Sequence, residues 1–138
     1  MSQILLAEDN PADVYLIREA LQEHRVCCTL RVVGDGQEFL RVVSESDAVA
    51  ACGVDLIILD LNLPRHDGIE ILRRLRQSAT LSGVPVVVLT SSDSPRDRQV
   101  ATALGATRFL RKPSSLEQFL SLGAVFRDLL ASADSATA

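Results

Sequence analysis

The chain has 138 residues, of which 47% are hydrophobic and 4% aromatic, and its formal net charge at pH 7 is -4. This is enough apolar material for one domain with a core of Leu, Val, Ile and Ala. The negative charge argues against a nucleic-acid-binding surface, which needs excess Lys and Arg to neutralise phosphates. The sequence contains neither an apolar run long enough for a membrane span nor a basic leader with a cleavage site, so we expect a cytoplasmic protein.

Short apolar runs, which predict buried strands, alternate along the chain with longer amphipathic segments, which predict helices. We expect strands over 3–7, 28–33, 56–59, 84–92 and 107–110. We expect helices over 11–24, 35–46, 67–78, 94–106 and 114–130. The remaining segment, 131–138, is small and polar, and it is expected to be a flexible tail.

Polar residues at the expected helix starts support these boundaries. Asp35 with Glu38, and Ser114 with Glu117, have the three-residue spacing of a capping box, in which two side chains satisfy free amides of the first turn. Ser94 is followed by a proline, which is typical of a capping residue before the first helical position.

The alternation predicts an α/β fold with a parallel sheet covered by helices on both sides. An eight-stranded barrel needs about 250 residues, so an open sheet remains. We expect a flavodoxin-like doubly wound (βα)5 fold with strand order 2-1-3-4-5. Residues 1–130 form the expected single domain.

Acidic residues follow two of the expected strands at the point where each ends. Glu8 and Asp9 follow the first strand, and Asp60 follows the third. In the expected strand order these two strands are neighbours, so the three carboxylates meet at one switch point. Crowded carboxylates repel one another, and a hard cation such as Mg²⁺, which prefers oxygen ligands, resolves this.

The other strand ends carry groups that suit phosphate chemistry. Thr90 and Ser91 supply hydroxyls at the end of the fourth strand, and Lys112 supplies a compact positive charge after the fifth. A carboxylate such as Asp60, surrounded by Mg²⁺, an ammonium and a hydroxyl, can attack phosphorus and form an aspartyl phosphate. Phosphoryl transfer requires mainly positioning and charge neutralisation, and these groups provide both.

The motifs "LLAEDN", "DLIILDLNLPRHDG", "VVVLTSS" and "FLRKP" closely resemble those of the receiver domain of two-component response regulators. The resemblance covers essentially the whole chain except the short tail. "EDNPAD" and "LDLNLP" are most similar to the small single-domain receivers that partner bacterial phytochromes.

The resemblance implies a role for each residue that matches these motifs. Asp60 is the implied phosphoacceptor, and Glu8, Asp9, Asp60 and the backbone carbonyl of Asn62 are the implied Mg²⁺ ligands.

The resemblance also implies phosphate-contact and switch residues. Thr90, followed by Ser91, is the implied switch hydroxyl, and Lys112 is the implied lysine that contacts the phosphoryl group. Phe109 takes the place of the switch aromatic, although Phe lacks the hydroxyl of a tyrosine. Pro113 follows Lys112 in what resembles the family's cis Lys-Pro bond.

These roles lead to a prediction of function. We expect a single-domain response regulator that receives its phosphoryl group from a sensor histidine kinase, of which a bacterial phytochrome is one candidate. Its output is then a protein contact or onward transfer of the phosphate, with no direct contact to nucleic acid or membrane. A homodimer through the fourth helix, the fifth strand and the fifth helix is a further hypothesis, and we do not expect an enzyme with a metabolic substrate.

Plainer interpretations stay open. Taken singly, Glu8 and Asp9 could be solvated loop residues, and Phe109 could equally be a core residue. The chain could be a binding module that acts without phosphorylation. It could also be an aspartate-nucleophile phosphohydrolase, but Asn62 stands where such enzymes commonly have an acidic residue.

Overall fold

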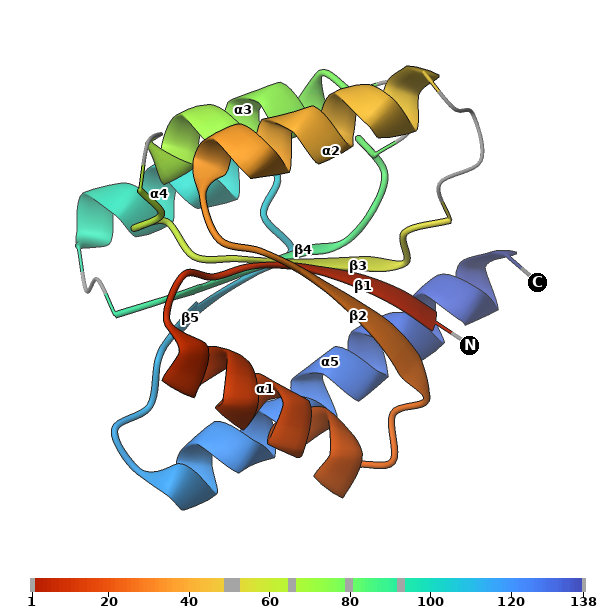
Figure 1. Cartoon of the computed structure of the whole chain (residues 1–138), viewed down its shortest axis with the longest axis vertical. Helices are drawn as coiled ribbons and strands as arrows, with labels where there is room; N and C mark the ends of the chain where they lie inside the picture. Colours follow the sequence, from red (N-terminus) through yellow and green to blue (C-terminus); the bar gives the residue numbers. More distant parts are fainter. Residues whose placement is uncertain (1, 49–52, 65–66, 79–80, 92–93, 138) are drawn as a thin grey trace.

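The computed structural model describes residues 2–48, 53–64, 67–78, 81–91 and 94–137. Strands and helices alternate strictly along the chain (Figure 1). The strands are β1 (Ser2–Ala7), β2 (Cys28–Val33), β3 (Leu56–Leu59), β4 (Val86–Thr90) and β5 (Arg108–Arg111). The helices are α1 (Pro11–Glu23), α2 (Gly36–Ala48), α3 (Gly68–Arg76), α4 (Pro95–Ala103) and α5 (Leu116–Thr137).

The strands form one parallel sheet in the order β2-β1-β3-β4-β5, which confirms the predicted fold. Helices α1 and α5 cover one face of the sheet, and α2, α3 and α4 cover the other (Figure 1). The strand order reverses between β1 and β3, and the register pairs Ala7 with Leu59 at the carboxyl ends of these two strands. This pairing makes the carboxyl edge of β1 and β3 the switch point of the sheet.

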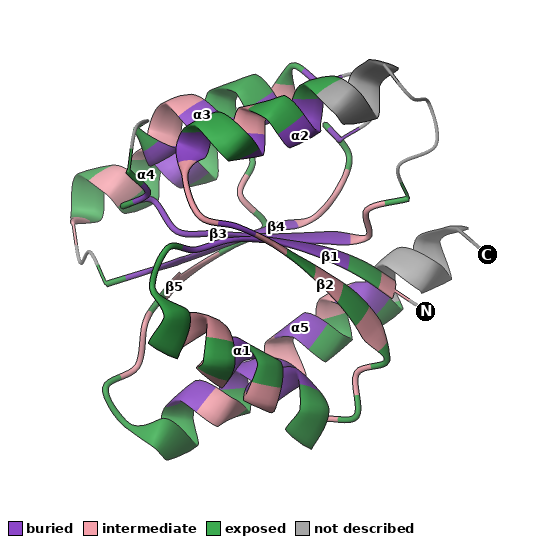
Figure 2. Cartoon of the chain, viewed as in Figure 1, coloured by how far each residue is buried: buried purple, intermediate pink, exposed green. Residues whose placement is uncertain are grey.

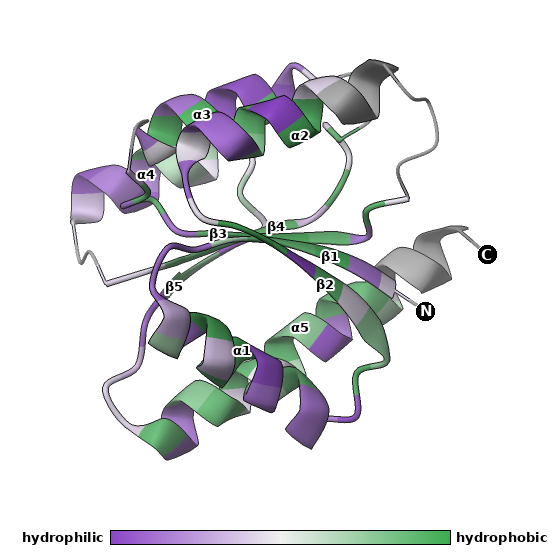
Figure 3. Cartoon of the chain, in the orientation of Figure 1, coloured by the Kyte–Doolittle hydropathy of each residue, from purple (hydrophilic) through white to green (hydrophobic). Residues whose placement is uncertain are grey.

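The core lies on both faces of the sheet. Every residue of β3 and β4 is buried (Figure 2), and both strands are mainly hydrophobic (Figure 3), as expected for central strands of a parallel sheet. Alternate residues face opposite sides: Leu5 and Ile57 pack toward α2 and α3, whereas Ile4 and Leu56 pack with Phe126 on the α1 and α5 side. None of the helices in the described part of the chain combines the length and apolarity needed to cross a bilayer.

Two of the predicted helix starts are confirmed. The Ser94 side chain accepts a hydrogen bond from the Asp97 amide at 3.3 Å, at the start of α4. The Asp35 carboxylate accepts from the Glu38 amide at 2.7 Å, at the start of α2. The Glu38 carboxylate reaches back to the amide of Gly34, at 3.3 Å, which is one residue before the position expected in a capping box.

The predicted boundaries of α5 are wrong at both ends. Ser115, not Ser114, caps the helix, since its hydroxyl accepts from the Gln118 amide at 3.1 Å. Either serine has a Glu or Gln three residues later, so the sequence pattern fits both starts. At its other end the helix continues to Thr137, through a segment rich in alanine, the strongest helix former. The flexibility of this segment stays a prediction.

Glycine permits a close approach between α1 and α5. A Cβ atom added at Gly123 would lie 2.2 Å from the carbonyl oxygen of Ala20 and 2.4 Å from Cδ2 of His24. Distances this short are steric clashes, so the two helices could not keep their present separation with a larger residue at this position. This contact matters for the site because α1 follows directly after the acidic end of β1.

Substitution Gly123→Ala tests this packing. Alanine favours a helix over glycine by about 1 kcal/mol, but we expect a net loss of about 1–3 kcal/mol in the free energy of unfolding, because the added methyl group forces the helices apart. Urea denaturation measures the change. Gly83→Ala is the matched control, because among the described residues, its two chain neighbours aside, no heavy atom lies within 4 Å of the added Cβ. Equal stability of the two variants would contradict the close-packing argument.

Candidate functional site

The ends of β1 and β3 bring Glu8 and Asp60 together. The Asp60 amide donates a hydrogen bond to the carbonyl oxygen of Ala7 at 3.0 Å, which continues the ladder beyond the strands. The Glu8 amide donates to the carbonyl oxygen of Val33 at 3.0 Å, on the other side of β1. These backbone contacts fix both acidic residues at the switch point.

Glu8, Asp9 and Asp60 form the acidic cluster that the sequence predicts. Each offers a carboxylate oxygen, and these oxygens lie within 4.8 Å of one another. Glu8 is only 3% exposed and Asp60 only 5%, whereas Asp9 faces solvent. The Glu8 carboxylate also accepts hydrogen bonds from the amides of Asp9, at 3.0 Å, and Asn10, at 3.4 Å.

Lys112 projects into this acidic cluster from the loop after β5. Its ammonium donates to the Oδ2 atoms of Asp60, at 2.9 Å, and Asp13, at 2.8 Å, and also to Oε1 of Glu8. The Lys112 amide donates to the carbonyl oxygen of Thr90 at 2.8 Å, which ties this residue to the end of β4. Its side chain is 12% exposed, so the ion pairs are largely removed from solvent.

Asp13 is the one partner of Lys112 that sequence reasoning missed. It lies in the first turn of α1, where an acidic residue is usually explained by the favourable field of the helix N-terminus. One sequence feature could have indicated that Asp13 lies near the site. Asp13 comes soon after the end of β1, and the first turn of the following helix stays near the carboxyl edge of the sheet. Neither spacing nor residue type indicates that its carboxylate turns toward Lys112.

Thr90 and Asn62 connect β4 to the loop after β3. The Asn62 side-chain amide donates to the hydroxyl oxygen of the fully buried Thr90 at 3.1 Å, and the Asn62 backbone amide donates to Oδ1 of Asp60 at 2.9 Å. The structure therefore places Asn62 and Thr90 beside Asp60. The role of the Asn62 carbonyl as a metal ligand and that of the exposed Ser91 in phosphate contact stay predictions.

Phe109 lies on β5, half-buried against the core on the α2, α3 and α4 side of the sheet. The guanidinium carbon of Arg98, on α4, lies 5.2 Å from the centre of its ring. At this distance the cation and the electron-rich ring face attract each other. The contact links α4 to β5, but the role of Phe109 as a switch stays a prediction.

The predicted cis bond between Lys112 and Pro113 is wrong. The structure has no cis peptide bond among its described residues, and both of these residues are described. The trans form of an X-Pro bond is the more stable by about 0.5–1 kcal/mol unless the surrounding structure selects cis. Lys112 reaches all three of its carboxylate partners with the trans bond.

The crowding of charge changes the acid–base properties of Glu8. Burial raises the pKa of Glu8 to about 7, and the negative charge of Asp60 adds to this effect, although the hydrogen bond from Lys112 opposes it. Burial by itself would lower the pKa of Lys112, but its hydrogen bonds to Asp13, Glu8 and Asp60 outweigh burial and raise it above the ordinary value. Three carboxylates thus contact a single ammonium, and the carboxylate of Asp9 lies beside those of Glu8 and Asp60.

This donor set fits a hard divalent cation. The acidic cluster offers oxygen atoms only, from residues on adjacent strand ends, and Asp9 gives it an exposed side. Mg²⁺ prefers oxygen ligands and keeps several waters, which an exposed side permits. The uncompensated negative charge gives the cation a favourable electrostatic environment.

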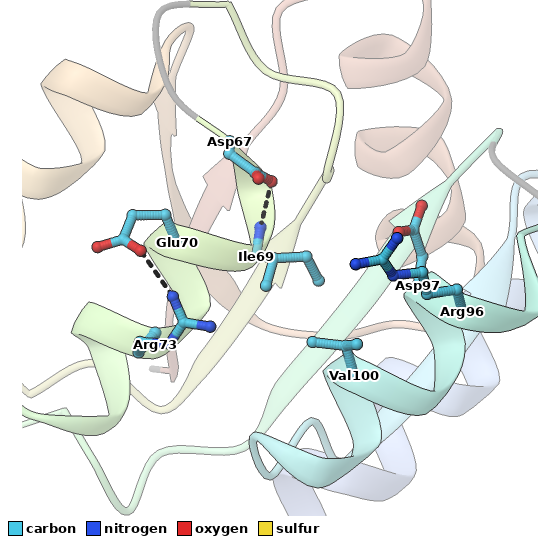
Figure 4. Close-up of a pocket in the computed structure, with 7 residues that line it drawn as sticks. All are labelled: Asp67, Ile69, Glu70, Arg73, Arg96, Asp97 and Val100. Atoms are coloured by element: carbon cyan, nitrogen blue, oxygen red, sulfur yellow. Dashed lines mark hydrogen bonds and ion pairs between the residues drawn. The ribbon is translucent and has the colours of Figure 1, made fainter.

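A separate hollow of about 500 Å³ lies between the first turns of α3 and α4 (Figure 4). It is lined by Asp67, Ile69, Glu70, Arg73, Arg96, Asp97 and Val100. Two of its acidic groups already have partners at the start of α3: Asp67 accepts from the Ile69 amide at 3.0 Å, and Glu70 pairs with Arg73 at 2.8 Å. None of the acidic-cluster residues lines it, so the candidate site is the edge of the sheet and not this hollow.

A comparison with known protein families gives a result that agrees with the fold and with the acidic edge of the sheet. The model of the response regulator receiver domain family matches residues 4–122. The chain therefore belongs to the response regulator receiver domain family. Receiver domains bind Mg²⁺ through acidic residues, are phosphorylated by histidine kinases and are generally signalling proteins rather than enzymes.

The relatives fall into two groups by length. The transcriptional regulatory protein TrcR of Mycobacterium tuberculosis is 38% identical over 119 residues, which cover 86% of this chain but 42% of TrcR. The chain spans less than half the length of this relative. The response regulator Rcp1 of Synechocystis is 34% identical over 122 residues, which cover 86% of this chain and 82% of Rcp1. The similarity to Rcp1 thus includes most of both chains.

Solved structures of phytochrome response regulators have the same fold. The phosphorylated cyanobacterial phytochrome response regulator RcpA superposes with a TM-score of 0.84 at 34% identity, covering 95% of this chain and 94% of RcpA. The Mn²⁺-bound form of Rcp1 superposes with a TM-score of 0.82 at 30% identity, covering 93% of each chain. The predicted resemblance to single-domain phytochrome-associated receivers is confirmed.

The raised pKa of Glu8 predicts a pH-dependent stability in the metal-free protein. Folding raises the pKa of Glu8 from 4.5 to about 7, so folding favours its protonated form. The stabilising contribution is fully present below pH 4.5 and is lost as the pH rises through about 7. We expect Glu8→Gln, which cannot ionise, to raise the free energy of unfolding by about 1–3 kcal/mol at about pH 8 and by much less at about pH 5.

Urea denaturation in the presence of a chelator measures this difference at both pH values. Glu117→Gln is the control, because Glu117 is exposed in the first turn of α5 and is not a member of the acidic cluster. The same stability gain at both pH values in Glu8→Gln would contradict the assignment to Glu8 ionisation.

Proposed function

We propose that Asp60 accepts a phosphoryl group from the phosphohistidine of a sensor histidine kinase in a Mg²⁺-dependent reaction. The observation that carries the proposal is the environment of the Asp60 carboxylate. It belongs to the acidic cluster, and its Oδ2 atom lies 2.9 Å from the Lys112 ammonium. Family membership supports the same role, since receiver domains are phosphorylated by histidine kinases.

The residues around Asp60 supply positioning and charge neutralisation. The Asn62 amide holds Oδ1 of Asp60 at 2.9 Å and thereby orients the carboxylate. In the reaction, an Asp60 oxygen forms the new bond to phosphorus while the bond from phosphorus to the kinase histidine nitrogen breaks. Lys112 neutralises charge on the transferred group, which is the main requirement of phosphoryl transfer.

The residues that would hold Mg²⁺ are Glu8, Asp9, Asp60 and the backbone carbonyl of Asn62. When bound, the cation supplies positive charge that offsets the negative charge of the phosphoryl oxygens. The acidic cluster supports this assignment because its oxygen atoms converge from two adjacent strand ends. A Mn²⁺-bound form of the similar Rcp1 is consistent with a divalent cation here.

The output of the switch is a changed protein-binding surface or onward transfer of the phosphate. In this proposal the Thr90 hydroxyl, which now accepts from the Asn62 side chain, donates to a phosphoryl oxygen on Asp60, with Ser91 as the neighbouring hydroxyl. Movement of Thr90 would free space toward β5, where Phe109 contacts Arg98 of α4. Phosphorylation thereby biases the surface formed by α4, β5 and α5 between two states.

The proposed partners are a sensor histidine kinase and a second copy of the chain. Similarity to Rcp1 and RcpA favours a bacterial phytochrome as the kinase. The proposed homodimer forms through α4, β5 and α5. Leu116, at the start of α5, is 61% exposed and supplies apolar surface for such a contact.

Intact mass spectrometry tests the phosphoacceptor. We expect acetyl phosphate to add one phosphoryl group to the wild-type protein in the presence of Mg²⁺ and none after chelation. Asp60→Asn removes the nucleophile and should give no adduct. Asp128→Asn, a substitution of an exposed aspartate on α5, should leave the adduct unchanged.

Beryllofluoride, a stable mimic of the phosphoryl group, covers the case of an adduct that hydrolyses too fast to be seen. A wild-type protein that neither gains mass nor responds spectroscopically to beryllofluoride would contradict the proposal. That result would favour a binding module that acts without phosphorylation. Rapid turnover of p-nitrophenyl phosphate would instead favour a phosphohydrolase.

Sedimentation measures the proposed dimer. We expect beryllofluoride with Mg²⁺ to shift the wild-type protein toward a dimer, and Leu116→Ser to weaken that dimer severalfold by removing exposed apolar surface. Tyr15→Ser is the matched control, because Tyr15 is 62% exposed but lies on α1, outside the proposed surface. A concentration-independent monomer mass with and without beryllofluoride would refute the dimer.

A further inference from the structure

Lys112 is the only lysine in the chain, and the other positively charged side chains, apart from histidine, are arginines. An ammonium has three N–H donors, and this one bonds to three carboxylates: Glu8, Asp13 and Asp60. A planar guanidinium could not point three donors at three separate acids from one nitrogen. The use of lysine at this single position therefore matches the geometry of its three partners.

Two of the three partners have other tasks in the proposed reaction. Glu8 and Asp60 belong to the acidic cluster, and Asp60 is also the proposed phosphoacceptor. Asp13 does not belong to the acidic cluster, and its carboxylate lies 2.8 Å from the ammonium. Of the three partners, Asp13 is thus the one whose carboxylate stays available to Lys112 when the other two hold a cation or carry a phosphoryl group.

The capped start of α1 fixes the position of the Asp13 backbone. The Asn10 side chain caps α1 by accepting from the Ala12 amide at 2.9 Å, and Pro11 fixes the first helical position. Asp13 is the third residue of the helix, so its backbone is fixed by the cap. Its side chain is only 19% exposed, and it faces the loop after β5 rather than solvent.

We propose that Asp13 is a positioning residue that holds the Lys112 ammonium toward Asp60 throughout the phosphorylation cycle. This inference rests on the proposed function, in which Lys112 neutralises the transferred phosphoryl group. With Asp13 present, Lys112 can exchange its contact to Asp60 Oδ2 for a phosphoryl oxygen without losing its anchor. Without Asp13, the flexible lysine side chain keeps only Glu8 and Asp60 as carboxylate partners, and both of these belong to the acidic cluster.

The direction in which Asp13→Ala changes the affinity for a phosphoryl mimic separates this role from a simple charge effect. Asp13 is negative, so if it acted only through its charge, Asp13→Ala would strengthen the binding of an anionic phosphoryl mimic. If Asp13 positions Lys112, Asp13→Ala weakens that binding. Asp13→Asn keeps an acceptor oxygen but no charge, so it should restore part of the loss.

The chain contains a matched control for a purely structural role. Asp97 occupies the same place in α4 that Asp13 occupies in α1: each is the third helical residue, after a capping side chain and a proline. Asp97→Ala therefore removes a carboxylate from an equivalent helix start that does not contact Lys112. Thermal unfolding of both variants shows whether either effect is a general loss of stability.

The first experiment observes Lys112 directly. Because the chain has one lysine, labelling with ¹⁵N-lysine gives a single ammonium resonance in an NMR spectrum. We expect a protected signal in the wild-type protein and in Asp97→Ala, and a lost or strongly shifted signal in Asp13→Ala. An ammonium signal in Asp13→Ala that is the same as in the wild type would overturn the proposal.

The second experiment titrates beryllofluoride at saturating Mg²⁺, with the Mg²⁺ affinity of each variant measured beforehand. We expect Asp13→Ala to weaken beryllofluoride binding at least fivefold, Asp13→Asn to weaken it less, and Asp97→Ala to leave it unchanged. In a Lys112→Ala background, adding Asp13→Ala should cause no further weakening, because Asp13 acts through Lys112.

Unchanged or tighter binding in Asp13→Ala, or an equal loss in the Lys112→Ala background, overturns the role of Asp13 alone. A wild-type protein that binds no beryllofluoride and gains no phosphoryl group overturns the proposed function, and the role of Asp13 falls with it. The ammonium spectrum and the wild-type titration thus distinguish a failure of the Asp13 role from a failure of the proposed function.

Discussion

The site depends on an imbalance of charge at the carboxyl edge of the sheet. One ammonium, that of Lys112, contacts three carboxylates, and the carboxylate of Asp9 lies beside them. Burial removes most of the water that would otherwise stabilise the carboxylates of Glu8 and Asp60, and the raised pKa of Glu8 is the direct consequence. This excess of negative charge makes the binding of a cation at this edge electrostatically favourable.

The fold maintains this imbalance at little cost to the core. Backbone hydrogen bonds from Glu8 to Val33, and from Asp60 to Ala7, fix the two buried acids by extending ladders that the sheet already has. The apolar residues before them, in β1 and β3, are almost completely buried and supply the stability that the charged edge lacks. A buried, charged site is thus supported by the most regular part of the molecule.

The sequence was sufficient to predict most of the site because strand ends in a parallel sheet meet at one edge. Glu8 and Asp60 directly follow the apolar runs of β1 and β3, Asp9 is the next residue after Glu8, and Lys112 directly follows β5. Their meeting therefore follows from strand order alone. Asp13 could not be found this way, since it belongs to a helix and its contact depends on the direction in which one side chain turns. The cis bond before Pro113 was predicted only from the resemblance to the family, and no local sequence pattern requires it.

The errors in α5 have a similar origin. Ser114 and Ser115 both precede a suitable partner at three residues' distance, so the pattern alone could not choose between them. The helix selects Ser115 because its hydroxyl is the one that meets the Gln118 amide. Local rules fix which kinds of residue end an element, whereas the exact residue depends on how the element packs.

The arrangement around Phe109 indicates how a switch can operate without a tyrosine hydroxyl. A phenylalanine ring cannot gain a hydrogen bond when it turns inward, so its two positions must differ in some other interaction. Arg98 provides one, because its guanidinium carbon lies 5.2 Å from the ring centre and the attraction is lost when the ring leaves. Arg98 belongs to α4, so any inward movement of Phe109 releases a side chain of that helix. The attraction between Arg98 and Phe109 therefore links α4 to β5, and if Phe109 is the predicted switch, its inward movement breaks this contact.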